Sequence, residues 1–303
     1  MKRVVSISLG SSTRNHKVET EFLGQKVSVE RIGTDGDLSK AINLIKELDG
    51  KVDAFGLGGI DLYLYAGNRR YILRDAKKIV DAARLTPIVD GSGLKNTLER
   101  KVIKYLHQHG LLDFENSKVL MVCAADRFGM AETLSSIGTK IIYGDLIFAL
   151  GLPIPLYSLD AVARVARIVG PIISRIPFKF LYPTGEKQEE LEPKFAQYYL
   201  DADIIAGDFH FIRRHMPQRL EGKTIITNTI TPQDLELLKQ RGVRKLITTT
   251  PELQGRSFGT NVMEGIIVAL SGQSGLSPQQ YEELLDAMKF EPRVVELPTE
   301  QII

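Results

Sequence analysis

Two groups of residues in the middle of the chain have types and spacing that suit nucleotide chemistry. The segment KVLMVCAADRFGMAETLSSIGTKIIYGD, residues 118–145, places a short loop, CAADRFG, between an apolar run and an amphipathic one. A loop that leads from a strand into a helix offers backbone amides to a phosphate, provided that small residues let the phosphate approach. Asp145 follows the next apolar run, 20 residues after Ala125. That is the spacing of a carboxylate that binds the hydroxyls of an adenosine ribose.

The loop departs from a glycine-rich phosphate loop. If its last glycine is Gly129, then Ala124 and Asp126 stand where the fingerprint has its first two glycines. Asp126 sets a carboxylate beside the expected phosphate, and Arg127 is the cation that could offset it. We predict a cofactor site made of Ala124, Asp126, Arg127, Gly129 and Asp145, with NAD favoured over NADP because Asp145 would repel a 2′-phosphate. The alternative is a βαβ unit whose loop contacts something else.

The elements that must position these residues follow from the hydrophobic pattern. Apolar, β-branched runs alternate with amphipathic segments, which is typical of a mostly parallel sheet covered by helices. We expect strands over 3–8, 26–32, 52–55 and 87–89, and helices over 16–23, 38–48, 74–83 and 94–109. A second series of strands is expected over 119–123, 141–143, 178–181, 204–206, 224–227 and 246–249. Six strands suit a doubly wound nucleotide-binding sheet.

The segment HGLLDFENSK, residues 109–118, interrupts the pattern with glycine and polar residues and predicts a domain boundary. We therefore expect an α/β protein with an N-terminal substrate-binding domain over 1–112 and a Rossmann-like, doubly wound domain over 113–272. The last segment, 273–303, is expected to form a helix and tail, with the helix returning to the first domain.

Composition restricts the class of partner. The chain has 39 basic and 37 acidic residues and a net charge of +2, so we expect no nucleic-acid or membrane partner and instead a small-molecule substrate. One cysteine, Cys123, allows neither an intrachain disulfide nor a thiolate metal cage. We expect a cytoplasmic protein without a metal site, and a homo-oligomer is left open.

Three further segments follow predicted strands. GLGGID, residues 56–61, fits either close backbone approach to a ligand or a tight turn. GDFHFIRRHMP, residues 207–217, offers arginines that could clamp an anion or form a solvated helix face. TTTPELQGRSFGTN, residues 248–261, offers hydroxyls for phosphate or polyol recognition, or polar strand residues. Cys123 is interpreted as a buried structural thiol.

The order of motifs resembles the shikimate/quinate 5-dehydrogenase family. SISLGSSTRNH is similar to that family's Ser-x-Ser-Pro-x-x-His-Asn segment, with Ser12 at the second serine, so the resemblance implies that Ser12 binds the substrate carboxylate. VDGSG matches the family's Asn-Thr-Asp-Gly-x-Gly segment and implies that Asp90 is catalytic. The family carries a substrate-binding glutamine where Glu264 stands, and Asn261 lies in the loop before it.

The family's catalytic lysine has no counterpart in the expected place. The corresponding stretch, AFGLGGIDLYLY, contains Tyr63 nearest the position, with Asp61 beside it. A tyrosine can act as an acid or a base if a cation lowers its pKa. Lys95, five residues after Asp90, is the other candidate to replace the missing lysine.

These observations lead to one leading hypothesis and two alternatives. The leading one is an NAD-linked oxidoreductase that acts on a small hydroxylated carboxylic acid, with Asp90 and either Tyr63 or Lys95 as the catalytic groups. The first alternative is a ligand-binding or sensor protein that keeps the fold without the chemistry. The second is an enzyme that uses another nucleotide on the same sheet.

Overall fold

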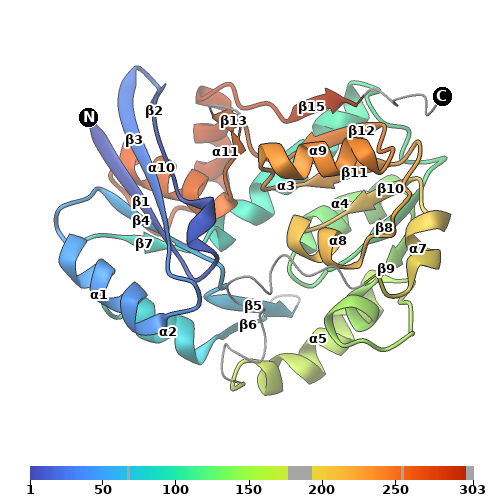
Figure 1. The fold of residues 1–303 in the computed structure, drawn as a ribbon, viewed down its shortest axis with the longest axis horizontal. Helices are drawn as coiled ribbons and strands as arrows, with labels where there is room; N and C mark the ends of the chain where they lie inside the picture. The colour runs from blue at the N-terminus through green and yellow to red at the C-terminus, as the bar shows by residue number, and fades with distance from the viewer. Residues whose placement is uncertain (67–68, 177–192, 254–255, 298–303) are drawn as a thin grey trace. The chain divides into compact units, whose positions relative to one another are not determined.

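The computed structural model describes residues 1–66, 69–176, 193–253 and 256–297, which form two compact units (Figure 1). Unit 1 comprises Met1–Thr97, the described part of Arg167–Glu189, and Gly259–Phe290. Unit 2 comprises Leu98–Ala166 and the described parts of Glu190–Phe258 and Glu291–Ile303. Each unit contains a mostly parallel sheet covered by helices, so the predicted α/β class is confirmed.

Unit 1 is built on a five-stranded sheet in the order β2-β3-β1-β4-β7. Its strands are β1 (Lys2–Ser8), β2 (His16–Phe22), β3 (Gln25–Gly33), β4 (Ala54–Gly58) and β7 (Ile88–Val89). All neighbours pair in parallel except β2, which is antiparallel to β3. The strand order reverses between β1 and β4, because the connection from β1 runs first to β3 on one side and then to β4 on the other.

Helices cover both faces of the unit 1 sheet. One set of alternating residues, including Val5, Ile7 and Phe55, packs in a core with side chains of α1 (Leu38–Leu48) and α2 (Arg74–Val80). The opposite set faces α10 (Thr260–Ser271), where a Cβ on Gly265 would approach Val4 within 2.9 Å. Unit 1 also holds a 3-10 turn (Ser12–Arg14), the ribbon β5 (Tyr63–Ala66) and β6 (Arg69–Ile72), and α11 (Pro278–Ala287).

The predicted helix over 16–23 is wrong, because this segment is the strand β2. Val18 and Thr20 are β-branched and alternate with Glu19 and Glu21, which is the two-residue period of a strand with one solvated face. The two-residue turn at 23–24 has positive φ at both positions, 50° and 72°. Such a turn joins adjacent antiparallel strands, so it folds β2 back on β3.

Unit 2 is built on a six-stranded sheet in the order β15-β12-β11-β10-β8-β9. Its strands are β8 (Lys118–Met121), β9 (Lys140–Tyr143), β10 (Ile204–Ala206), β11 (Thr224–Thr227), β12 (Lys245–Thr248) and β15 (Arg293–Glu296). The first five are parallel, and β15 adds an antiparallel edge beside β12. The parallel order 2-1-3-4-5 is the flavodoxin-like doubly wound order, whose reversal lies between β8 and β10.

The helices of unit 2 pack on this sheet around an apolar core. They include α4 (Phe128–Ile137), α7 (Ala196–Asp201), α8 (Phe209–His215) and α9 (Pro232–Gln240), with a π-helical turn at Asp145–Ala149 and the short ribbon of β13 (Glu252–Leu253) and β14 (Arg256–Ser257). Leu120, Ile205, Ile225 and Leu246 supply the strand side of the core. Two helices, α3 (Ser92–Gln108) and α5 (Leu159–Ile173), contain points where the chain passes between the units.

Several element bounds differ from the expected ones. The strand expected over 52–55 lies at 54–58, the helices over 74–83 and 94–109 lie at 74–80 and 92–108, and the strand expected over 178–181 falls outside the described residues. The sixth strand of the second sheet is β15, in the segment interpreted as helix and tail. Both α10 and α11 belong to unit 1, so the chain returns there at Gly259.

Within the described parts of the chain, no helix combines the length and apolar character that crossing a membrane requires.

Candidate functional site

The candidate site in unit 1 lies where the parallel strands of its sheet end. The strands β1, β3, β4 and β7 share one direction, so their carboxyl ends meet at one edge. Open α/β sheets bind ligands outside this edge, at the point where the strand order reverses. The charged side chains that lie at or just after these strand ends are Arg31, Asp35, Asp61, Asp90 and Lys95.

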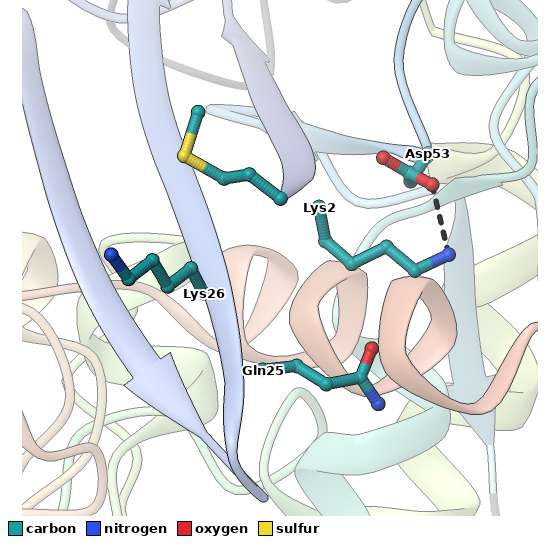
Figure 2. Close-up of a pocket in the computed structure, with 5 residues that line it drawn as sticks. Lys2, Gln25, Lys26 and Asp53 are labelled. Atoms are coloured by element: carbon teal, nitrogen blue, oxygen red, sulfur yellow. Dashed lines mark hydrogen bonds and ion pairs between the residues drawn. The ribbon is translucent and has the colours of Figure 1, made fainter.

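A hollow in unit 1 lies at the opposite, amino-terminal edge. It has a volume of about 390 Å³ and is lined by Met1, Lys2, Gln25, Lys26 and Asp53 (Figure 2). Lys2 Nζ donates to Asp53 Oδ1 at 3.0 Å, and the Arg3 amide donates to Asp53 Oδ2 at 2.8 Å. These bonds tie β1 to the residue before β4. The hollow is at the wrong end of the strands for a ligand site of this fold class, so we assign Asp53 a structural role.

Lys95 and Asp61 form an ion pair at this edge. Asp61 follows β4, and Lys95 projects from the first turn of α3. Lys95 Nζ lies 3.5 Å from Asp61 Oδ1. Lys95 is only 8% exposed, whereas a quarter of the Asp61 side chain is exposed. The structure thus brings Lys95 to Asp61, and the pairing of Lys95 with Asp90 that the sequence suggested stays a prediction.

Asp90 holds the loop around this pair. Its Oδ2 accepts from the Leu62 amide at 2.7 Å, and its Oδ1 accepts from the amide and the hydroxyl of Ser92 at 3.0 and 2.6 Å. The carboxylate therefore fixes the residue after Asp61 and the start of α3 together. This geometry positions the segments that carry Asp61 and Lys95.

Tyr63 and Ser12 also lie near this edge. Tyr63 is half-buried and begins β5, directly after the residue whose amide binds Asp90. Ser12 lies in the 3-10 turn after β1, and its amide donates to Asp35 Oδ1 at 2.6 Å. Arg31 bridges the same region, because its Nη2 donates to Ser8 Oγ at 3.0 Å and its Nη1 donates to the Ser11 carbonyl at 3.0 Å.

Glu264 is buried under the loop that contains Asp90. It is 4% exposed, and its Oε1 accepts a short hydrogen bond from the Tyr281 hydroxyl. Burial raises the pKa of Glu264 to about 7, and the negative charge of Asp90 adds to the effect against the opposing bond from Tyr281. Glu264 is thus enclosed by the chain's own side chains, and the substrate contact that the resemblance implied stays a prediction.

Asn261 and the glycines of this region pack α10 on the sheet. Asn261 Nδ2 donates to Ser6 Oγ at 2.9 Å, inside the sheet layer. A Cβ on Gly56 would come within 2.9 Å of the Asn261 carbonyl, and one on Gly91 would come within 2.5 Å of the Asn261 amide. Gly56 and Gly91 therefore allow α10 to approach the sheet, and the substrate contact predicted for Asn261 stays a prediction.

The predicted cofactor site in unit 2 is filled by the chain itself. Asp145 Oδ2 accepts from the Ala124 amide at 3.1 Å, and Oδ1 accepts from the Ala125 amide at 2.8 Å. Asp145 is 7% exposed, and burial raises its pKa to about 6 although these amides oppose the shift. The spacing correctly placed Asp145 beside the loop, but its carboxylate faces the loop amides that were expected to meet a ligand.

Arg127 is also committed to internal partners. The side chain is 1% exposed, makes a short contact with Glu99 of α3, and donates from Nη2 to Asp208 Oδ2 at 2.9 Å. Burial lowers the pKa of a guanidinium, but the surrounding carboxylates outweigh it and raise the pKa of Arg127. Asp126 lies 3.8 Å from Arg127 Nε, and Gly129 is buried in the first turn of α4.

The arrangement of this loop does not fit a bound pyrophosphate. Two of its amides are bonded to a carboxylate, its cation is buried in a cluster of acids, and Asp208 joins that cluster from beyond the neighbouring strand β10. A pyrophosphate needs amides and positive charge that face outward. The loop therefore presents neither the Ala124 amide nor the Arg127 guanidinium to a ligand in this structure, and the nucleotide site stays a prediction.

The other segments singled out in the sequence have internal roles. Thr248 and Thr250 are fully buried and donate their hydroxyls to carbonyls of the same loop region at 2.7 Å. Burial raises the pKa of the Cys123 thiol well above its usual range, which agrees with a structural thiol. Among the residues that the structure describes, no group of three His, Cys, Asp or Glu side chains is placed to hold a metal ion.

Sequence reasoning missed the partners in both units. Asp61 was noted only as a neighbour of Tyr63, and Arg31, Glu99 and Asp208 were not singled out. One signal for Asp61 was available, since it directly follows a glycine-rich turn at the end of a buried strand. Glu99 and Asp208 carry no local signal, because their role depends on Arg127, 28 and 81 residues away.

The comparison with protein families identifies the chain as a member of a family described only as a domain of unknown function. The family model Domain of unknown function (DUF8754) matches residues 93–297, so the chain belongs to this family. A second model, Domain of unknown function (DUF8753), matches residues 3–90. A search of curated proteins finds no match.

Similar solved structures include both dehydrogenases and sugar-binding proteins. A hetero-hexameric glutamate dehydrogenase from Thermus thermophilus is 13% identical, with a TM-score of 0.42 over 95% of this chain and 74% of that one. An NAD-dependent malic enzyme from Thermotoga maritima is 12% identical, with a TM-score of 0.37 over 95% and 84%. A galactofuranose binding protein is 10% identical, with a TM-score of 0.36 over 95% and 99%. Likenesses of this size assign no function.

Proposed function

We propose that the chain binds a small hydroxylated carboxylic acid at the carboxyl-end edge of the unit 1 sheet. The pair of Lys95 and Asp61 carries this proposal. Lys95 is 8% exposed, and its Nζ lies 3.5 Å from Asp61 Oδ1 at the edge of the sheet where this fold class binds ligands. A buried cation beside a carboxylate at this edge is typical of a functional site.

The charges of this edge favour a hydroxy acid as the ligand. Lys95 and Arg31 supply positive charge for a carboxylate, and Asp61 can accept a hydrogen bond from a hydroxyl. Asp90 keeps the segments that carry Asp61 and Lys95 in place through its bonds to the Leu62 and Ser92 amides. The cations would thus bind the carboxylate of a hydroxylated acid, and Asp61 would bind its hydroxyl.

The test is isothermal titration of the protein with quinate and with shikimate. We expect binding by the wild-type chain and at least tenfold weaker binding by Lys95→Met, because the substitution removes the cation but keeps the volume of the aliphatic stem. Lys2→Met is the matched control, since it breaks an ion pair at the other edge of the same sheet and should leave the affinity unchanged. Wild-type affinity in Lys95→Met would refute the proposal.

A second candidate function is an oxidoreductase that acts on the same ligand with a nicotinamide cofactor. The pair of Lys95 and Asp61 favours it. Asp61 lies beside Tyr63, the residue nearest the position of the family's lysine, and Lys95 follows Asp90, the residue that matches the family's aspartate. The pair could take the proton of a ligand hydroxyl. The filled loop in unit 2 weighs against it.

Turnover distinguishes the two candidates. An oxidoreductase would change nicotinamide absorbance in the presence of quinate or shikimate, and Lys95→Met would abolish that change. A binding protein would show the heat of ligand binding without any absorbance change. The binding proposal makes the second result the expected one.

A further inference from the structure

The loop after β8 in unit 2 has the backbone geometry of an anion site. The amides of Ala124 and Ala125 are consecutive and point at the two oxygens of one carboxylate, at 3.1 and 2.8 Å. Successive N–H groups that converge in this way form a nest, a concavity that binds phosphate or carboxylate groups in many proteins. Here the anion is the side chain of Asp145 from the same unit.

The backbone holds Asp145 in this position. The Gly144 amide donates to the Met121 carbonyl at 2.8 Å, which brings the end of β9 against the end of β8. A Cβ on Gly144 would overlap the Phe148 ring, so a larger residue before Asp145 would require Phe148 to shift. Tyr143 exchanges two backbone bonds with Leu156 on its other side. These backbone bonds on both sides of β9 therefore hold the Asp145 carboxylate next to the amides of Ala124 and Ala125.

The charge around the nest opposes an added anion. Glu99 and Asp208 hold the buried guanidinium of Arg127, and Asp208 also accepts from Asn228 Nδ2 at 3.1 Å. With Asp126, three carboxylates surround this one guanidinium, and Asp145 adds a further negative charge at the loop amides. The described residues of the loop thus offer a pyrophosphate neither a vacant pair of amides at Ala124 and Ala125 nor an exposed cation at Arg127.

We infer that Asp145 acts as a built-in substitute for a phosphate and keeps pyrophosphate-bearing ligands, nicotinamide dinucleotides included, out of unit 2. This inference concerns a loop of unit 2 and does not depend on the ligand proposed for unit 1. It implies that a single carboxylate, in addition to the missing glycines, separates this loop from a working phosphate loop.

The test is isothermal titration with ADP-ribose, which carries the pyrophosphate without the reactive ring. We expect wild-type binding to be too weak for a heat signal at millimolar ligand. Asp145→Ala frees both amides and removes the charge, so it should bind ADP-ribose at least tenfold more tightly than the wild type. Asp145→Asn removes the charge but keeps one acceptor oxygen for the loop amides. Its affinity for ADP-ribose should therefore rise less than that of Asp145→Ala, and it should keep more of the wild-type stability.

Asp160→Asn is the matched control, because it removes the same charge from an exposed position in unit 2. Its affinity for ADP-ribose should equal that of the wild type. Micromolar binding of ADP-ribose by the wild type would overturn the inference, and it requires no variant. Unchanged or weaker binding by folded Asp145 variants would overturn it as well, since a carboxylate that holds the ribose would be lost in them. Neither result bears on the titrations with quinate and shikimate.

Discussion

Replacing Glu264 by glutamine is predicted to change how the stability of the protein depends on pH. The folded chain raises the pKa of Glu264 from 4.5 to about 7, mainly by burial and also through the charge of Asp90. The folded state therefore holds the proton more tightly than the unfolded state. The stability from this group is fully present below the unfolded pKa of 4.5 and is lost as the pH rises through about 7.

The size of the effect follows from these two pKa values. One pKa unit corresponds to about 1.4 kcal/mol, so the free energy of unfolding should fall by about 2.5 kcal/mol between about pH 5 and about pH 8. Glu264→Gln has no titrating group, and its amide oxygen can still accept from the Tyr281 hydroxyl. The wild type should therefore lose this amount relative to the variant across that range.

The assay is urea unfolding followed by circular dichroism, for both proteins, at several pH values between those limits. Comparing the two proteins at each pH cancels the titration of every other group that the substitution leaves alone. A difference between wild type and variant that stays constant across the pH range would refute the reasoning, because it would mean that burial does not raise the pKa of Glu264.

Three further substitutions or probes test separate features. Gly91→Ala should destabilise the protein by about 2 kcal/mol or more in urea unfolding, because its φ is 91° and its new Cβ would meet the Asn261 amide. Arg127→Met should cost about 3–5 kcal/mol in the same assay by leaving buried carboxylates uncompensated, whereas Arg100→Met, which breaks a partly exposed pair, should cost less than about 1 kcal/mol. Cys123 should resist iodoacetamide in the native protein and react in urea, as judged by mass spectrometry, because burial raises its thiol pKa.

Local patterns predicted most of the fold. Runs such as 3–8 and 224–227 are apolar and β-branched, so they give strands wherever a parallel sheet buries them, and α1 was predicted over 38–48, the bounds that it has. The strand β2 was missed because charged residues separate its few apolar side chains. The turn at 23–24 makes it a strand, since it folds this segment back on β3. The edge strand β15 was missed because its pairing with β12 depends on a chain return that no local pattern specifies.

The candidate site was harder to predict, because spacing along the chain does not fix the direction of a side chain. Asp145 lies beside the loop, as its spacing suggested, yet it bonds to the loop amides. Lys95 was expected near Asp90, and the structure places it beside Asp61, because α3 begins close to the residues that follow β4. The glycines of VDGSG matched a family motif, and their physical reason is the close approach of α10.

Hydrogen exchange of the backbone amides with and without quinate tests most directly whether unit 1 carries the ligand site. The account predicts slower exchange in the presence of quinate at the carboxyl ends of the unit 1 strands, in residues 10–13, 59–63 and 90–96, and unchanged exchange in the unit 2 loops at 123–129 and 207–210. Protection in those unit 2 loops, with none at the unit 1 edge, would contradict it.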